Sequence, residues 1–140
     1  MKVRLFSAFI LISLTTTVWM YGCKKKEKES SNSDYAGTWN VNETCTSAWS
    51  YVMSIATSGS DGVTLTNFHK GSFASGFTIN ATVSDKTLTI ASQQASSVNQ
   101  GGPYTFAGSG TFTPPSSLSI TYTMRDASGA TINCTANCTK

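Results

Sequence analysis

Apolar and polar residues alternate along most of the chain after residue 35, and this alternation predicts β-strands. In Phe77–Val83 every second residue is apolar, and the residues between are Thr and Asn. A period of two places successive side chains on opposite faces of a strand. Eight segments show the pattern: Gly37–Thr46, Trp49–Thr57, Val63–Phe68, Phe77–Val83, Thr87–Ser92, Tyr104–Phe112, Leu118–Met124 and Ala130–Thr139.

Short connections between these segments favour one way of covering their apolar face. Asp61-Gly62, Ser84–Lys86 and Asp126–Gly129 are turn sequences of hairpin length, and Pro114-Pro115 ends a strand because proline has no backbone N–H. A Greek-key sandwich needs longer crossings, whereas an antiparallel meander with short turns closes on itself. We therefore predict an all-β domain over residues 35–140, an antiparallel up-and-down β-barrel of about eight strands.

The first 34 residues differ in character from the rest. Residues 1–22 carry two basic residues and then a largely apolar run, which is typical of a signal peptide. Gly22-Cys23 resembles the bacterial lipobox, and this implies that Cys23 is lipidated and becomes the mature N-terminus. The polar, charged residues after it predict a disordered tether over 23–34. The alternatives are an ordinary signal peptide with an incidental cysteine and, less favoured because the run is short, an uncleaved membrane helix.

Charge is concentrated in the N-terminal segment, and this changes the choice of partner. The formal net charge of the whole chain is +3, but the part from Asp34 onward has four basic and five acidic residues, a net charge of −1. Nucleic-acid binding needs a clustered basic face, so we expect no nucleic acid as a partner. The expected partner of the N-terminus is the membrane, reached through the lipid.

The opening of the first predicted strand, Gly37-Thr38-Trp39, resembles the Gly-x-Trp motif of lipocalin-like proteins. Together with the lipobox, it makes the chain similar to small lipocalin-like lipoproteins of the Bacteroidetes type. The resemblance implies that Gly37 permits a tight entry into the barrel and that Trp39 plugs its closed end. It also implies a late arginine stacked on the tryptophan, for which Arg125 is the candidate. The expected location is the bacterial cell envelope, anchored to the outer membrane on its periplasmic face or at the cell surface.

Three cysteines follow the lipobox, and the closed meander pairs two of them. The last strand of such a barrel lies antiparallel to the first, so the end of the first strand faces the early half of the last. Cys45 then faces Cys134 better than Cys138, and we predict a Cys45–Cys134 disulfide. We expect no metal site, because these cysteines and His69 lack the spacing of zinc ligands.

Glu43 is the one charged residue on the apolar face of its strand. An unpaired buried carboxylate is costly. It could line a polar opening and contact a ligand, pair with Arg125 or a tyrosine hydroxyl, or lie at the barrel rim in water. The rim and the structural pair are favoured over the ligand contact.

No catalytic motif is present, so we expect a binding protein without a cofactor and not an enzyme. His69 lies in a Gly/Ser-rich segment and is expected to be solvated. The first hypothesis is a hollow barrel that binds a small apolar molecule. The second is a filled barrel whose loops, His69–Gly76 and Gln93–Gly102, contact an envelope protein or glycan, with Trp49 as a contact or a rim residue. A cavity above roughly 300 Å³ would favour the first. Its predicted lining is Glu43, Tyr51, Phe77, Tyr104, Phe106, Tyr122 and Met124.

Overall fold

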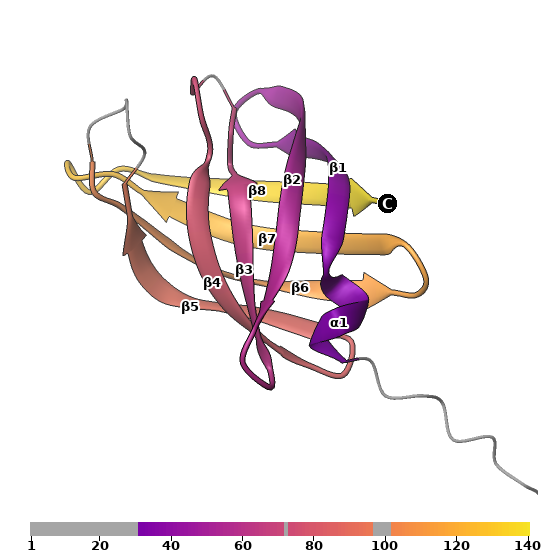
Figure 1. Ribbon diagram of the computed structural model, residues 1–140. Helices are drawn as coiled ribbons and strands as arrows, with labels where there is room; N and C mark the ends of the chain where they lie inside the picture. Colours follow the sequence, from indigo (N-terminus) through magenta and orange to yellow (C-terminus); the bar gives the residue numbers. More distant parts are fainter. Residues whose placement is uncertain (1–30, 72, 97–101) are drawn as a thin grey trace, which may run out of the picture.

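A computed structural model describes residues 31–71, 73–96 and 102–140 of the chain (Figure 1). It contains one short helix and eight strands. The predicted signal peptide, the lipidated Cys23 and most of the predicted tether lie outside the described residues. The elements are α1 (Asn32–Tyr35), β1 (Gly37–Thr44), β2 (Ala48–Ser58), β3 (Gly62–Phe68), β4 (Phe77–Ser84), β5 (Thr87–Ala95), β6 (Tyr104–Thr113), β7 (Ser117–Arg125) and β8 (Thr131–Thr139).

The strands form a closed barrel in sequence order, with every neighbouring pair antiparallel. The predicted fold class, an eight-stranded up-and-down β-barrel, is confirmed. β1 closes the barrel on β8, with Val41 opposite Cys138 and Thr44 opposite Thr135. In Figure 1, β1 to β4 run in front of β6 to β8 and cross them. Within the described residues, no helix is long and apolar enough to span a membrane.

The alternation along each strand separates an apolar interior from a polar outer wall. In β4 the side chains of Phe77, Ile79, Ala81 and Val83 are buried, and the Thr, Asn and Ser residues between them are exposed. β7 repeats the pattern without exception. Burial of the apolar face of every strand in one core is what stabilises a barrel of this size.

One end of the barrel is closed by α1 and the first residues of β1. Trp39 and Tyr35 are fully buried there, and the Trp39 indole N–H donates to the Tyr35 carbonyl at 2.8 Å. Lys140 Nζ lies 4.7 Å from the centroid of the Trp39 ring and donates to the carbonyls of Asp34 and Ala36 at 2.7 and 2.8 Å. We call this end the closed end.

Two sequence predictions about the closed end are wrong. The cation over Trp39 is Lys140, whereas Arg125 lies at the end of β7, at the opposite end of the barrel. The last residues of the predicted tether are ordered as α1, because the Asn32 side chain donates to the Gly59 carbonyl at 2.9 Å. A four-residue helix has no apolar periodicity by which the sequence could reveal it.

Two glycines in β6 let that strand approach β7 closely. A Cβ on Gly108 would lie 2.5 Å from both the Thr121 carbonyl oxygen and the Tyr122 Cβ, and one on Gly110 would lie 3.0 Å from the Ser119 carbonyl oxygen. These inward glycines leave out side chains that the narrow interior could not hold, and they permit the sharp coiling that a barrel needs.

The wall is incomplete between β4 and β5. The two strands pair only from Thr82 opposite Thr89 to the turn, and β5 then bulges before Gln93. The Gln93 carboxamide bridges the gap: its Oε1 accepts from the Asn80 N–H at 3.0 Å and its Nε2 donates to the Asn80 carbonyl at 2.6 Å. Gln93, predicted to begin a loop, is therefore part of the wall. Residues 97–101 of that predicted loop lie outside the described residues.

Candidate functional site

Glu43 lies inside the barrel, near the end opposite to Trp39, with 1% of its surface exposed. β1 directs it inward between Val41 and Cys45. Its Oε1 accepts hydrogen bonds from Tyr51 OH of β2, at 2.9 Å, and from Tyr122 OH of β7. Of the alternatives left open by the sequence, the pair with tyrosine hydroxyls is therefore observed. The exposed rim position is wrong, because Glu43 is buried. The pair with Arg125 is also wrong, because the groups that donate to the Glu43 carboxylate are the hydroxyls of Tyr51 and Tyr122.

His69 completes this buried polar cluster. Its Nδ1 lies 2.6 Å from Tyr122 OH and 3.3 Å from Glu43 Oε2, and its backbone N–H donates to Tyr51 OH at 3.0 Å. His69 is 6% exposed, so the prediction of a solvated loop histidine is wrong. Glu43, Tyr51, Tyr122 and His69 are named the polar cluster below.

A bulge at the end of β3 turns His69 into the barrel. The β3–β4 register shifts between Thr66 and Phe68, and both Asn67 and His69 have positive φ, 66° and 49°. This conformation is uncommon outside glycine and marks a backbone held in place by its surroundings. The Asn67 side chain supplies part of the hold, because it donates to the Val52 carbonyl and accepts from the Gly76 N–H at 2.9 Å.

The positions of the protons in the polar cluster follow from counting donors. Each tyrosine hydroxyl has one proton, and both are donated to Glu43. The oxygen of Tyr122 must then accept from His69, so the proton lies on His69 Nδ1. In a neutral imidazole this leaves Nε2 as the acceptor nitrogen. Glu43 Oε2 has no hydrogen bond to the described residues, and the same Nδ1 lies 3.3 Å from it.

The cluster holds Glu43 ionised and the tyrosines protonated. Burial raises the pKa of the Glu43 carboxyl, but the His69 imidazole, 3.3 Å away, and the hydrogen bonds from Tyr122 and Tyr51 outweigh it and lower the pKa below its usual value. Burial and then the Glu43 charge raise the pKa of Tyr51 and Tyr122. The same two causes raise the pKa of the buried Cys138 thiol to about 12, so this thiol is an inert core residue.

A pocket of about 190 Å³ opens above the polar cluster at the end of the barrel opposite to the closed end, and we call it the mouth pocket. His69 forms part of its wall, together with Phe73 and Met124. Trp49, 40% exposed, stands at its edge and so is the rim residue that the sequence allowed. The complete lining is Cys45, Thr46, Ser47, Trp49, His69, Gly71, Phe73, Met124 and Ile132.

The Cys45–Cys134 disulfide, predicted from strand closure, is present beside this pocket. It joins Cys45, the residue that follows β1, to Cys134 of β8, with 4.3 Å between the Cα atoms. Cys134 is buried and Cys45 is half-buried at the pocket wall. The bridge therefore fixes the seam of the barrel at the mouth.

Three of the seven residues predicted to line a ligand cavity form the packed core beneath the mouth. Phe77 lies with its ring centroid 4.9 Å from Phe106 and 5.4 Å from Tyr104. Phe68, which was not in the predicted lining, packs 4.6 Å from Tyr122. Of the predicted lining residues, Met124 alone belongs to the mouth pocket, whereas Tyr51, Tyr122 and Glu43 lie in the polar cluster that supports its histidine.

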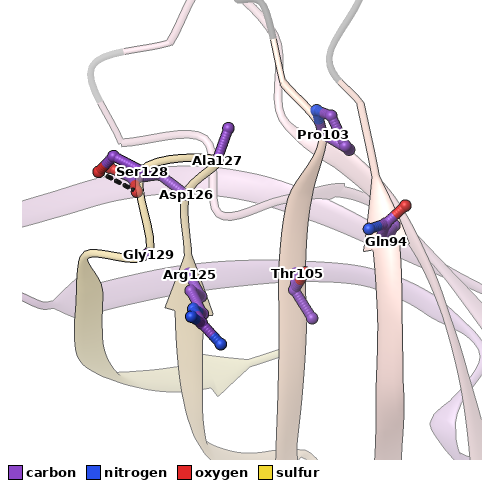
Figure 2. A pocket seen from close by; sticks show the side chains of 8 residues that line it. All are labelled: Gln94, Pro103, Thr105, Arg125, Asp126, Ala127, Ser128 and Gly129. Carbon is purple, nitrogen blue, oxygen red and sulfur yellow. Dashed lines mark hydrogen bonds between the residues drawn. The ribbon is translucent and has the colours of Figure 1, made fainter.

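A second hollow, of about 410 Å³, lies on the outer wall near the mouth (Figure 2). Gln94, Thr105 and Arg125 stand side by side across β5, β6 and β7, because Gln94 pairs with Thr105 and Thr105 with Arg125. The β7–β8 turn borders it, where Asp126 accepts hydrogen bonds from the Ser128 hydroxyl and the Ala130 N–H at 2.6 and 2.9 Å. We call it the outer hollow. Arg125 forms no ion pair with the described residues.

Comparison with known proteins supports the fold and leaves the family open. No protein-family model matches the chain, and no curated protein sequence matches it either. Among solved structures, it is similar to EF1p2_mFAP2b bound to DFHBI, with 16% identity, a TM-score of 0.56, and coverage of 77% of this chain and 94% of the other. It is also similar to two redesigned β-barrels: mFAP1 bound to DFHBI (18% identity, TM-score 0.53, 78% and 97% covered) and b11L5F_LGL (15%, 0.52, 78% and 93%). At this identity the likeness shows a shared eight-stranded barrel architecture.

Proposed function

We propose that this protein binds a small, mainly apolar molecule at the mouth pocket and does not act on it as an enzyme. The observation that carries the proposal is a pocket that opens on a buried histidine whose proton is fixed by a carboxylate and a tyrosine. A functional side chain held by a network beneath a pocket is the arrangement expected of a preorganised binding site. Two of the similar barrels have DFHBI bound, and this supports the use of the architecture for small ligands.

The volume limits the size of the ligand. Drug-sized ligands occupy pockets of about 300–1,000 Å³, whereas an apolar cavity of about 150 Å³ accepts benzene. At about 190 Å³, the mouth pocket is smaller than the roughly 300 Å³ that would favour a hollow carrier barrel, so the proposed ligand is limited to a molecule with one ring. Trp49, Phe73 and Ile132 supply the apolar surface. His69 Nε2 would accept a hydrogen bond from a hydroxyl or N–H of the ligand, so phenols and small N–H heterocycles are the preferred class.

The test is a screen of single-ring fragments by ligand-observed NMR on the oxidised protein. Ser47 lies at the mouth and Ser60 in the β2–β3 turn at the opposite end, and both are exposed. We expect Ser47→Trp to abolish binding by filling the pocket and Ser60→Trp to leave it unchanged. The proposal would be contradicted if no fragment bound to the wild type, or if the fragments that bind did so equally to Ser47→Trp and Ser60→Trp.

The N-terminal features lead us to propose a lipid anchor at Cys23 and a place in the bacterial envelope, as in lipocalin-like lipoproteins of the Bacteroidetes type. α1 supports this arrangement, since it brings the chain to the closed end and leaves the mouth at the other end (Figure 1). Metabolic labelling with a palmitate analogue, lost in Cys23→Ser, would test the anchor. Labelling that persists in that variant would contradict it.

A second candidate function is recognition of an acidic glycan at the outer hollow. The row of Gln94, Thr105 and Arg125 supports it, because an Arg guanidinium without an ion-pair partner among the described residues suits a carboxylate and the other two side chains suit hydroxyls. Glucuronate and glucose are the matched probes. Binding of glucuronate alone, lost in Arg125→Gln, would favour this candidate, and equal binding of both sugars would exclude it.

A further inference from the structure

We propose that reduction of the Cys45–Cys134 disulfide converts the wall of the mouth pocket into a binding site for monovalent copper. One donor atom from each of Cys45, Cys134 and His69 lies within 4.8 Å of the others. In the oxidised protein the two sulfurs are bonded to each other and cannot act as ligands. The spacing along the chain does not predict a metal site, because Cys45 and His69 are 24 positions apart and His69 and Cys134 are 65 positions apart. Closure of the barrel brings the three together.

The backbone keeps the two thiols together after reduction. The Cα atoms are 4.3 Å apart, and the adjacent pair Thr44–Thr135 belongs to the β1–β8 ladder. Two thiolates on one metal at bonds of about 2.3 Å in tetrahedral geometry stand roughly 3.8 Å apart. This is also about the closest approach of two sulfurs that are not bonded, so the reduced pair needs little backbone movement to hold an ion.

His69 is oriented as a metal ligand by the groups behind it. Its Nδ1–H donates to Tyr122 and faces Glu43 Oε2 at 3.3 Å, so the lone pair of the ring is on Nε2. Metal-binding histidines usually donate their other N–H to a carboxylate or similar acceptor, which fixes the tautomer and strengthens the ligand. Glu43 Oε2, buried without a hydrogen bond to the described residues, places a negative charge behind the imidazole, next to the nitrogen that does not bind the metal.

The donor set selects the metal. Thiolates and imidazole together suit copper(I) and zinc, and a thioether in the same site favours copper(I), the softer of the two ions. Met124 lines the same pocket and places a thioether there. An oxygen-preferring ion such as magnesium or calcium would find no carboxylate in the pocket wall, where the lining residues are neutral apart from the imidazole.

The switch requires a dithiol reductant from outside the protein. The dithiol transfers two electrons and two protons to the disulfide and leaves as its own disulfide, and the protein then carries two thiols. Binding of copper(I) by both sulfurs releases these two protons to solvent. The site therefore exists only in the reduced protein, whereas the proposed organic ligand is tested on the oxidised protein, so failure of one proposal leaves the other standing.

The experiment is a copper(I) titration of the folded protein against a chromogenic copper(I) chelator, before and after reduction. We expect one equivalent to be retained by the reduced wild type and none by the oxidised protein. Cys138→Ser is the matched control, because Cys138 is the remaining buried thiol of the barrel, and it should bind as the wild type does. The double variant Cys45→Ser/Cys134→Ser should not take copper(I) from the chelator. His69→Gln should bind copper(I) tenfold or more weakly than the wild type.

Stability gives a second readout in case reduction loosens the barrel. Copper(I) at 100 times its Kd should raise the Tm of the reduced wild type, since an ion that binds the folded state alone stabilises it. The variant Cys45→Ser/Cys134→Ser also lacks the disulfide, as the reduced wild type does, but copper(I) should not raise its Tm. Equal copper retention by the wild type and the double variant, or binding that disappears in Cys138→Ser, would overturn the proposal.

Discussion

Removal of the Tyr122 hydroxyl measures what the polar cluster contributes to stability. Tyr122→Phe deletes the donor to the Glu43 carboxylate and the acceptor of the His69 Nδ1–H. A hydrogen bond to a charged group contributes about 1.5–3 kcal/mol. The His69 N–H can turn to Glu43 Oε2, 3.3 Å away, and recover part of its own loss. We therefore expect the free energy of unfolding to fall by about 2–3 kcal/mol, near the upper end of that range.

Tyr35→Phe is the matched control, because Tyr35 is buried too but its hydroxyl donates to a neutral acceptor, the Asp85 carbonyl, at 3.1 Å. Its removal should cost about 1 kcal/mol. Urea denaturation of the oxidised proteins, followed by intrinsic fluorescence, gives both values. For a domain of about 100 residues, the Tyr122 variant should melt about 10 °C or more below the wild type.

The pH dependence separates a charged acceptor from a packing defect. Glu43 has a lowered pKa in the folded state, so its contribution is complete above its unfolded value of about 4.5 and is lost as pH falls through the folded pKa. The cost of Tyr122→Phe should therefore shrink below pH 4.5, whereas that of Tyr35→Phe should stay constant. Equal costs for the two variants at pH 7, or a Tyr122 cost that does not change with pH, would refute the reasoning.

Three further perturbations test the barrel itself. Gly108→Ala places a Cβ 2.5 Å from a backbone oxygen of the next strand, so stability in urea should fall by about 2 kcal/mol, and an unchanged midpoint would show that β6 can shift. Cys45→Ser/Cys134→Ser opens a loop with a sequence separation of 89 and should cost about 3–5 kcal/mol by thermal unfolding; a loss below 1 kcal/mol would mean that the ladder alone holds the seam. Gln93→Ala removes the acceptor of the Asn80 N–H, so hydrogen exchange at that amide should accelerate about fivefold, and no change would mean that the gap is closed in another way.

The strands and the disulfide were predictable because each depends on a simple periodic rule. Alternation of apolar and polar residues located all eight strands to within a few residues, and antiparallel closure then paired Cys45 with Cys134. These inferences need only which face a residue occupies. They do not depend on the path of any loop.

The site was predicted poorly because it depends on local backbone geometry. His69 was predicted to be solvated because it lies in a Gly/Ser-rich segment, which is typical of a surface loop. The positive φ of Asn67 and His69 turns the ring inward, and no alternation of apolar and polar residues predicts it. Glu43 stood out from the sequence as a charge on an apolar face, but its partners come from three other elements. Lys140, one residue beyond β8, reaches Trp39 from a position that strand patterns do not address.

The pairing of β1 with β8 also constrains the order of events during folding. Hairpins between neighbouring strands can form as soon as both strands are available, but the first strand keeps an open edge until the last one arrives. Closing that edge joins residues nearly a hundred positions apart, a slow step since the entropy of a long loop must be lost first. Until then, the apolar face of a curved, open sheet is accessible to other chains. Because Cys45 and Cys134 meet only when β1 pairs with β8, their disulfide would form at this last step and make the closure permanent. A chain in which either cysteine formed a different disulfide before closure would be held open, with the edge of β1 exposed.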